Sequence, residues 1–453
     1  MRKLLEEAQW LSFTTDVWTN PTNTCSLLSF TGHFLDDGKR RKVVLSVMVL
    51  DSDHTGDYLA SKLTEAISSW NLQGKVHLGV RDNAANMICA MRIAQITDVG
   101  CMAHTLQLVI RDALFTQPSV ETLIKKSRRI VTHFKHSEQS CRKFEECQKT
   151  CNVPSHKLLQ DVETRWNSTY IMLERLVEQR RAVSLFAVDH GGIDNLTTAD
   201  WELTERVVHV LQPFYAATLE ISSDDACISV MVPVIAMLQG KMQSSTADQG
   251  LLQMKAALRD SINRRFATVK ESAHVIAATL LDPRFKESYF SVQEKAAAKN
   301  EVLRFLRQHE ATAGNDGEQQ PQTTLRAQPA STATASQSLT SSLWEVHDHL
   351  QLSSDSETTE NLPAYQQELE NYLRETCLPR STDIYAYWHN SQYRSLEPAA
   401  KKYLSAPPTS VASEQLFSSA GQLYADRRNS LNGDNAEKLL FLSYNIRLFG
   451  FNY

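Results

Sequence analysis

The spacing of apolar residues changes along the chain, and this change limits the folds that the chain can adopt. Before about residue 100, short runs rich in β-branched and apolar residues alternate with turn residues, as is typical of strands. Three runs in close succession predict an antiparallel meander, and a fourth follows a stretch of helical period: Leu11–Trp18, Ser26–Phe34, Val43–Leu50 and Val76–Val80. Between about 120 and 307 the period is almost wholly helical. We therefore predict a mixed α/β region joined to a large all-α region.

Length and composition divide this pattern into four regions. At 453 residues the chain exceeds a single hydrophobic core, because such cores stop growing near about 250–300 residues. Residues 308–343 contain almost no large apolar side chains and predict a disordered linker. The predicted regions are the first part of an α/β core over 10–119, a helical insertion over 120–307, this linker, and the end of the core with a C-terminal region over 344–453.

The overall charge does not indicate a dedicated nucleic-acid-binding domain, because such domains are usually strongly basic and this chain has a net charge of −5. One stretch, residues 121–149, carries eight Lys and Arg against four Glu. We predict its members Lys125, Lys126, Arg128 and Arg129 as contacts to DNA phosphates. Its apolar residues have near-helical spacing, so an amphipathic helix with a solvated charged face is the alternative interpretation.

The cysteines and the absence of long apolar runs indicate the compartment. The sequence has no run of about 18 apolar residues and no secretory signal pattern, so we expect an intracellular protein without a membrane span. Eight cysteines at irregular spacing, without a Cys-x-x-Cys pair, predict reduced thiols. Cys101 and His104 have the spacing of half a zinc site, but no second pair lies near them, so zinc is not expected.

Two aspartates follow predicted strands. Asp16 lies late in the first strand, and Asp82 comes directly after the fourth. If these strands are neighbours in a sheet, their carboxylates meet at one edge, and such proximity is costly unless a cation neutralises it. Paired hard cations bound by oxygen ligands drive in-line displacement at phosphorus. The alternative for each aspartate is a turn or helix cap.

Six motifs in order resemble those of hAT-superfamily transposases and their relatives with BED-type zinc fingers. They are Phe13–Thr19 (FTTDVWT), Asp82–Met87 (DNAANM), Cys101–Leu108 (CMAHTLQL), Thr164–Tyr170 (TRWNSTY), Leu280–Lys286 (LLDPRFK) and Pro408–Ser418 (PTSVASEQLFS). The resemblance spans about residues 10–449. It implies a ribonuclease-H-like mixed sheet interrupted by a large helical insertion, followed by a hAT C-terminal dimerisation region.

The resemblance also implies roles for individual residues. Asp16, Asp82 and Glu414 correspond to the three catalytic acids, which would hold two Mg²⁺ (or Mn²⁺) ions. Trp166 resembles the aromatic residue on which a flipped base stacks, and Arg165 beside it is predicted to contact phosphate. A core anchor is the alternative role for Trp166. In the family, the Cys-x-x-His motif of Cys101 and His104 lies near the active site, and we assign it no role.

Departures from the family pattern favour a repurposed protein. The family usually has a small hydroxyl residue before the second Asp, where this chain has Arg81, and Arg after the Glu, where it has Gln415. The paired cysteines and histidines of a BED finger are not found in the sequence, so either the sequence is truncated or the protein has been repurposed. We therefore expect a nuclear, DNA-binding protein that dimerises and has a regulatory role. An active metal-dependent transposase is the alternative.

The final predicted helix, Asn435–Phe449, is apolar over more of its circumference than one core-facing stripe requires. We predict that Leu439, Leu442, Ile446 and Phe449 form a dimer interface. The preceding segment adds aromatic residues that are typical of interface cores, namely Tyr372, Tyr385, Tyr387, Trp388, Tyr393 and Tyr403. The alternative is that the helix packs within its own monomer against the sheet.

Overall fold

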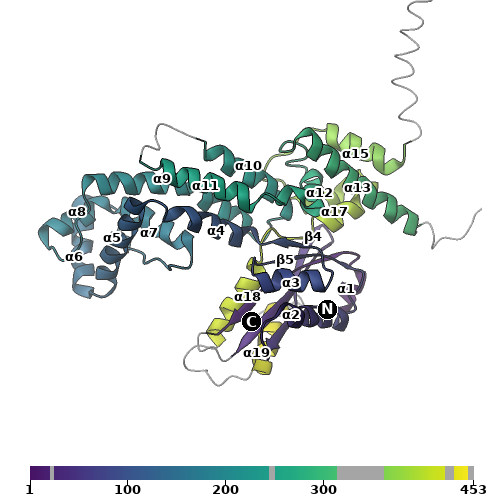
Figure 1. Cartoon of the computed structure of the whole chain (residues 1–453), viewed down its shortest axis with the longest axis horizontal. Helices are drawn as coiled ribbons and strands as arrows, with labels where there is room; N and C mark the ends of the chain where they lie inside the picture. The colour runs from purple at the N-terminus through teal and green to yellow at the C-terminus, as the bar shows by residue number, and fades with distance from the viewer. Residues whose placement is uncertain (21–24, 244–249, 314–361, 424–432, 447–453) are drawn as a thin grey trace, which may run out of the picture.

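A computed structural model describes the chain except for residues 21–24, 244–249, 314–361, 424–432 and 447–453 (Figure 1). The linker predicted over 308–343 lies mostly outside the described residues, but its first residues, 308–313, continue a helix, so the predicted linker begins too early. Among the helices that the structure describes, none combines the length and apolar character needed to cross a membrane.

A six-stranded mixed sheet forms the base of the molecule. The strands are β1 (Leu11–Thr14), β2 (Val17–Thr19), β3 (Ser26–Asp36), β4 (Lys39–Leu50), β5 (Val76–Arg81) and β6 (Asp98–Gly100). The paired strands follow the order β2-β3-β1-β5-β6, and β4 also pairs with β3. β1 and β2 pair with different parts of one edge of β3, and β4 pairs along its other edge. β3 pairs antiparallel with β1, β2 and β4, whereas β5 runs parallel to both β1 and β6. The predicted meander and the mixed sheet are thus confirmed.

Local sequence accounts for the long β3–β4 hairpin. Its turn is Asp37-Gly38, and both residues have positive φ, at 46° and 65°. Asp-Gly is a favoured pair for a two-residue turn of this kind, whose twist matches that of the flanking strands. The hairpin therefore forms where the runs of apolar and β-branched residues on either side of this turn predict strands.

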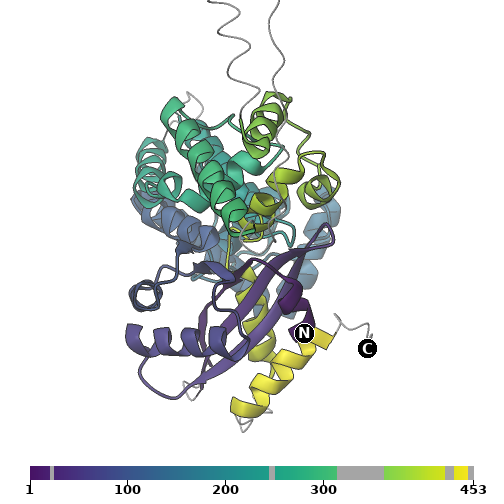
Figure 2. The same cartoon turned by 90° about the vertical axis from the view of Figure 1, so that its right-hand side faces the viewer.

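The sheet is covered on both faces. On one face, α1 (Arg2–Glu7), α2 (Gly56–Ser69) and α3 (Ala85–Ile93) enclose a core that includes Phe13, Phe30 and Leu59. On the other face, α18 (Val411–Leu423) and α19 (Gly433–Asn445) pack on β3 and β4 around Leu27 and Leu440. Figure 2 shows these last two helices, in yellow, beside the strands.

The remaining helices form the predicted insertion and its continuation, which extend away from the sheet (Figure 1). They are α4 (Met102–Leu114), α5 (Pro118–Lys135), α6 (Glu138–Cys151), α7 (Trp166–Glu178), α8 (Arg180–Asp189), α9 (Thr198–Ile221), α10 (Met231–Lys241), α11 (Leu252–Arg265), α12 (Ala273–Leu281), α13 (Val292–Ala313), α15 (Ala364–Arg374), α16 (Ile384–Asn390) and α17 (Glu397–Tyr403), with short 3₁₀ turns at Ile228–Val230, Val269–Glu271 and Arg394–Leu396.

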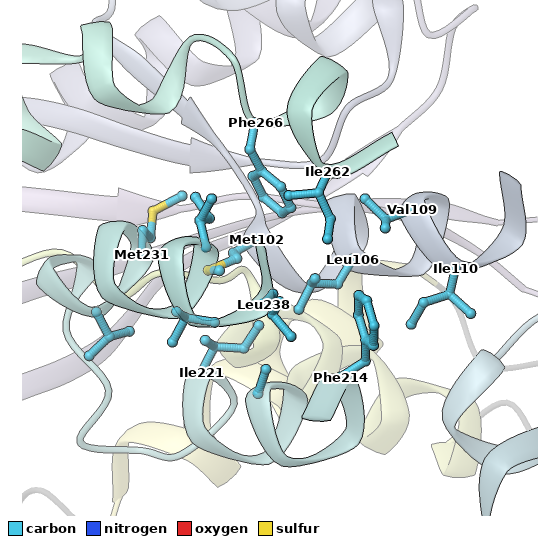
Figure 3. Close-up of a cluster of buried hydrophobic side chains, with 14 of the residues drawn as sticks. Met102, Leu106, Val109, Ile110, Phe214, Ile221, Met231, Leu238, Ile262 and Phe266 are labelled. Atoms are coloured by element: carbon cyan, nitrogen blue, oxygen red, sulfur yellow. The ribbon is translucent and has the colours of Figure 1, made fainter. Parts of the chain in front are cut away.

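One apolar core joins the insertion to the sheet. α4 begins directly after β6, and its buried face meets α9, α10 and α11 (Figure 3). Met102 and Leu106 of α4 lie in this core with Phe214 of α9 and Ile262 of α11. Leu78 and Val80 of β5 belong to the same core, so the insertion packs directly on the sheet.

Two expectations about the C-terminal third require correction. Five of the six aromatic residues predicted at a dimer interface are buried in the monomer's own helical core, and the sixth, Tyr387, packs against it. Trp388, for example, is 2% exposed and donates a hydrogen bond from Nε1 to the carbonyl of Leu281. These aromatics therefore serve packing within the chain. The last helix also begins two residues earlier than predicted, at Gly433, and the end of its predicted range, 447–449, lies outside the described residues.

Candidate active site at the edge of the sheet

Asp16 lies at an interruption of the first strand. The sequence predicts one strand over Leu11–Trp18, but the structure divides it into β1 and β2. Between them, Asp16 N–H donates to Ser29 Oγ at 3.1 Å, and the carbonyl of Asp16 accepts from Ser29 N–H at 3.0 Å. The regular strand is therefore interrupted at Asp16, the residue that carries the candidate carboxylate.

Asp82 follows the neighbouring strand, as predicted. β1 and β5 pair in parallel, with Thr14 opposite Val80, so Asp16 and Asp82 lie two residues beyond a paired position on adjacent strands. Asp82 Oδ1 also accepts from Ala84 N–H at 3.2 Å. The turn-capping role given as the alternative is therefore present, and it fixes the carboxylate at the entry to α3.

Glu414 reaches the same edge on the first turn of α18. The segment before this helix is held by the insertion: Met102 N–H donates to the carbonyl of Pro408 at 3.0 Å, and Ile228 N–H donates to that of Ala406 at 2.9 Å. The structure thus brings together three acids from distant parts of the chain.

The electrostatics of Asp16 reflect this convergence. Burial, reinforced by the negative charges of Asp82 and Glu414 and opposed by the hydrogen bond from Val17 N–H, raises the pKa of Asp16 to about 7. Carboxylates are the ligands that hard divalent cations prefer, so the donor set fits Mg²⁺ or Mn²⁺. Within the described residues, no group of three or more His, Cys, Asp or Glu side chains is already arranged to hold a metal ion. The metal-binding role of the three acids therefore stays a prediction.

Arg81, the first departure from the family pattern, turns away from the three acids. Its guanidinium forms a salt bridge with Asp98 at 2.5 Å and donates to the carbonyl of Asp82 at 2.8 Å. The side chain is therefore directed toward β6, where a carboxylate neutralises it.

Gln415, the second departure, contacts a lysine that the sequence analysis missed. Lys42 of β4 donates to Gln415 Oε1 at 3.2 Å and forms a salt bridge with Asp224 at 2.9 Å. The ammonium group of Lys42 on β4 therefore contacts the side chain of Gln415, the residue that follows Glu414 in the sequence. Local sequence gave no signal for it, because Lys42 and Gln415 are 373 positions apart.

Cys101 connects the strand of Asp82 to the segment of Glu414. Its N–H donates to the carbonyl of Arg81 at 2.6 Å, and its Sγ accepts from Ser410 N–H at 3.3 Å. Burial raises the pKa of this thiol, so it stays neutral. His104, one turn further along α4, is half-buried. Cys101 thus has a structural contact with the segment before Glu414, and the placement of the pair near the active site stays an implication of the resemblance.

The predicted DNA contacts at the start of α7 differ in accessibility. Trp166 is 5% exposed and packs in the helical core beside Tyr170, with ring centroids 6.5 Å apart. It offers no free face to a flipped base in this structure, so the core-anchor interpretation holds. Arg165 directly before it is exposed.

In the basic stretch, the charges of the four predicted DNA contacts are neutralised by acidic residues of the same chain. Each of its four predicted DNA contacts has an acidic partner: Lys125 with Glu121, Lys126 with Asp200, Arg128 with Asp161 and Glu163, and Arg129 with Asp194. The Asp161 side chain is 1% exposed, so its pair with Arg128 is part of the fold. The amphipathic-helix alternative describes this stretch better than a free phosphate-binding surface does.

The last helix has two different faces. Leu440 is fully buried against β4, and Asn445 exchanges two hydrogen bonds with the backbone of Val44. On the outer side, Leu439 and Leu442 are 46% and 54% exposed. Of the other predicted interface residues, Ile446 is half-buried and Phe449 lies outside the described residues.

Comparison with known domain families finds matches for three parts of the chain. Three family models match: the ZBED1 RNase-like domain over residues 14–104, the ZBED1 RNase-like helical domain over 99–210, and the hAT family C-terminal dimerisation region over 368–446. The predicted fold class is therefore confirmed.

The chain also resembles longer curated proteins. It is 26% identical to zinc finger BED domain-containing protein 4 of Homo sapiens, over 99% of this chain and 38% of that protein. It is 28% identical to zinc finger BED domain-containing protein 6 of Homo sapiens, over 99% of this chain and 49% of that protein. A Zea mays protein named for the AC transposase is 25% identical, over 97% of this chain and 57% of that protein. The chain thus spans about half or less of the two human relatives.

Proposed function

Since this chain carries the ribonuclease-H-like and dimerisation domains found in zinc finger BED proteins and hAT transposases, we propose that it is a transposase-derived nuclear protein that dimerises through its C-terminal region and binds DNA in a regulatory role. The observation that carries this proposal is the outer face of α19. Leu439 and Leu442 are about half exposed there, within the matched dimerisation region.

The two faces of α19 explain why a second copy would bind. The inner face already fixes the helix on β4 through Leu440 and Asn445, so the outer leucines are displayed on a rigid element. Burying them against a second copy removes apolar surface from water. A two-fold interface of this kind uses the same patch twice. In such a dimer each DNA contact also occurs twice, which suits DNA sites with two-fold symmetry.

Sedimentation of the full chain tests the dimer. We expect a dimer at micromolar concentration, and a monomer when Leu439→Glu and Leu442→Glu are combined. Leu252→Glu is the matched control, because Leu252 is 60% exposed on α11, outside the dimerisation region. A parent chain that sediments as a monomer throughout the concentration range would refute this function.

Salt-dependent binding to duplex DNA tests the second part. Arg165 is exposed and, among the described residues, forms no salt bridge, so Arg165→Ala should weaken binding to all sequences and make the salt dependence less steep. Lys125→Ala should have less effect, because Glu121 already neutralises Lys125. Absence of DNA binding at low salt contradicts the proposal. A fluorescent fusion of the chain should accumulate in the nucleus.

A second candidate function, metal-dependent DNA strand cleavage, is favoured by the convergence of Asp16, Asp82 and Glu414. These residues would hold Mg²⁺ or Mn²⁺, which when bound supplies an activated attacking hydroxyl and stabilises the leaving oxygen. Arg81 leaves the site open, because Asp98 holds its guanidinium.

A nicking assay on duplex DNA tests this candidate. If the full chain cleaves in Mg²⁺ or Mn²⁺, Asp82→Asn should abolish cleavage without loss of folding. Asp260→Asn is the control, because Asp260 is a largely exposed residue of α11 outside this site. Cleavage that survives Asp82→Asn excludes the assigned site, and an inactive parent chain supports the regulatory function alone.

A further inference from the structure

A row of buried hydroxyl groups lies between β1 and the segment that leads to Glu414. Ser12 and Thr14 alternate with the apolar residues of β1, so they point to the other face of the sheet. An alternating pattern usually means that the polar face meets water. Here both hydroxyl residues are fully buried, because the segment over 404–413 covers them.

Two hydroxyl contacts join this segment to the strand. Ser405 Oγ donates to Ser12 Oγ at 3.2 Å, and Ser413 Oγ donates to Thr14 Oγ1 at 3.2 Å. All four side chains are 0% exposed. Thr14 Oγ1 also lies 3.3 Å from Nε2 of the buried His33 on β3. The contacts thus align one segment with alternate positions of β1.

Buried hydroxyl pairs of this kind specify an arrangement more than they stabilise it. Desolvation of the two groups offsets much of the hydrogen-bond energy, and apolar side chains of the same shape would pack at least as favourably. A shift of one residue, however, leaves buried hydroxyls without partners, which is costly. The pair therefore selects one register between the segment and the strand.

We propose that Thr14 and Ser413 are positioning residues that hold Glu414 at Asp16. Thr14 lies two residues before Asp16, and Ser413 lies directly before Glu414, so their contact joins the two backbones close to both carboxylates. This inference rests on the three-acid site of the second candidate function. It adds residues that contact neither substrate nor metal and act through Glu414.

The apolar contacts of α18 cannot supply this register alone. Leu416, Phe417 and Ala420 pack on the sheet, and the ring of Phe417 stacks on Trp18 with centroids 6.1 Å apart. Apolar packing is non-directional and accommodates small shifts by repacking. Hydrogen bonds require specific distances and angles. The Thr14–Ser413 contact therefore fixes the position of the first turn of α18 along β1.

Binding of Mn²⁺ to the full chain, measured by titration calorimetry, tests the proposal. Thr14→Val and Ser413→Ala each remove one side of the contact and should weaken Mn²⁺ binding about tenfold, as is usual for groups that orient metal ligands. The two changes together should weaken it no more than either alone, because they disrupt one contact. Thr14→Ser keeps the hydroxyl and should retain the parent affinity.

Thr31→Val is the matched control. Thr31 lies opposite Thr14 in the β1–β3 register and is also buried, but its hydroxyl has no partner among the residues that the structure describes. Its replacement should change Mn²⁺ affinity less than twofold. In a Glu414→Gln background, Thr14→Val should also change it less than twofold. An equal loss in both backgrounds, or an equal loss in Thr31→Val, overturns the proposal.

A second readout does not depend on metal. In protein labelled with 5-fluorotryptophan, the ¹⁹F resonance of Trp18, assigned with Trp18→Phe, reports the docking of Phe417 and so of α18. It should shift in Thr14→Val and Ser413→Ala and stay in place in Thr31→Val. If the parent binds no Mn²⁺, strand cleavage fails as a function, and this resonance still decides the positioning role. An unchanged Trp18 resonance in both variants overturns it.

Discussion

Replacing Asp16 with Asn should stabilise the metal-free protein at pH 8, although Asp16 belongs to the candidate site. Burial, reinforced by the charges of Asp82 and Glu414, raises the pKa of Asp16 to about 7 from an ordinary value of 3.8. Between these two values the unfolded chain has lost the proton that the folded chain keeps. Stability therefore falls as the pH rises through this window, and it stays low above pH 7.

The structure sets the size of this effect. One pKa unit corresponds to about 1.4 kcal/mol, so the interval from 3.8 to about 7 gives an upper limit of about 4 kcal/mol. Asn removes the charge, and its Oδ1 still accepts the hydrogen bond that Val17 N–H donates to Asp16 at 2.9 Å. We expect a gain of about 1–3 kcal/mol at pH 8, and a gain roughly two to three times smaller at pH 5.

Unfolding by urea in the presence of EDTA, at pH 5 and pH 8, measures the difference between parent and variant. Asp112→Asn is the contrasting variant, because hydrogen bonds from Arg265, followed by Ser261, lower the pKa of Asp112 to about 2. It should lose about 1 kcal/mol at pH 8, since the carboxylate is partly exposed and screened. An Asp16→Asn variant less stable than the parent at pH 8, or stabilised equally at both pH values, would refute the reasoning.

Four further variants test the packing and the buried charges described above. Leu440→Ala should cost about 2–5 kcal/mol in urea unfolding, because Leu440 of α19 is fully buried against the sheet. Asp161→Ala should cost about 3–5 kcal/mol by leaving Arg128 without its main partner, whereas Lys125→Ala, at an exposed pair, should cost about 0.5 kcal/mol or less. Burial lowers the pKa of His274 to about 4, so His274→Gln should flatten the loss of stability between pH 6.5 and pH 4, measured by thermal unfolding.

The strands and helices were predictable because their signals are local. The turn at Asp37-Gly38 and the runs of apolar and β-branched residues on either side of it predict the long hairpin without further context. The sequence analysis gave the approach of Asp16 to Asp82 only on the condition that their strands are neighbours, and the structure shows that β1 and β5 are parallel neighbours. Glu414 was placed by family resemblance alone, since no local pattern connects it to the sheet.

The errors have one physical cause, which is that burial and pairing depend on residues far away in sequence. Arg128 looks available for phosphate until Asp161, 33 positions later, is placed against it. Trp388 looks like an interface residue until the helical core encloses it. Composition shows that a side chain needs partners, but it does not show whether those partners belong to the same chain.

The buried hydroxyl groups of β1 also show that burial cannot be predicted from nearby sequence. Ser12 and Thr14 would be assigned to a solvated face from their alternation, and nothing nearby in sequence indicates a cover. The segment that buries these two hydroxyl groups contains Ser405 and Ser413, which lie 393 and 399 positions after them in the sequence. Polar residues on a sheet that is covered on both faces are therefore candidates for register-setting contacts.

The helical insertion determines where the third acid stands. The chain leaves the sheet after β6, and the segment that leads into α18 returns to β1 at Ser405, so Glu414 depends on how the segment over 404–410 is anchored. Cys101 supplies one anchor, because its N–H bonds to the carbonyl of Arg81 and its Sγ bonds to Ser410 N–H. One residue thus connects the strand that ends at Asp82 with the segment that leads to Glu414.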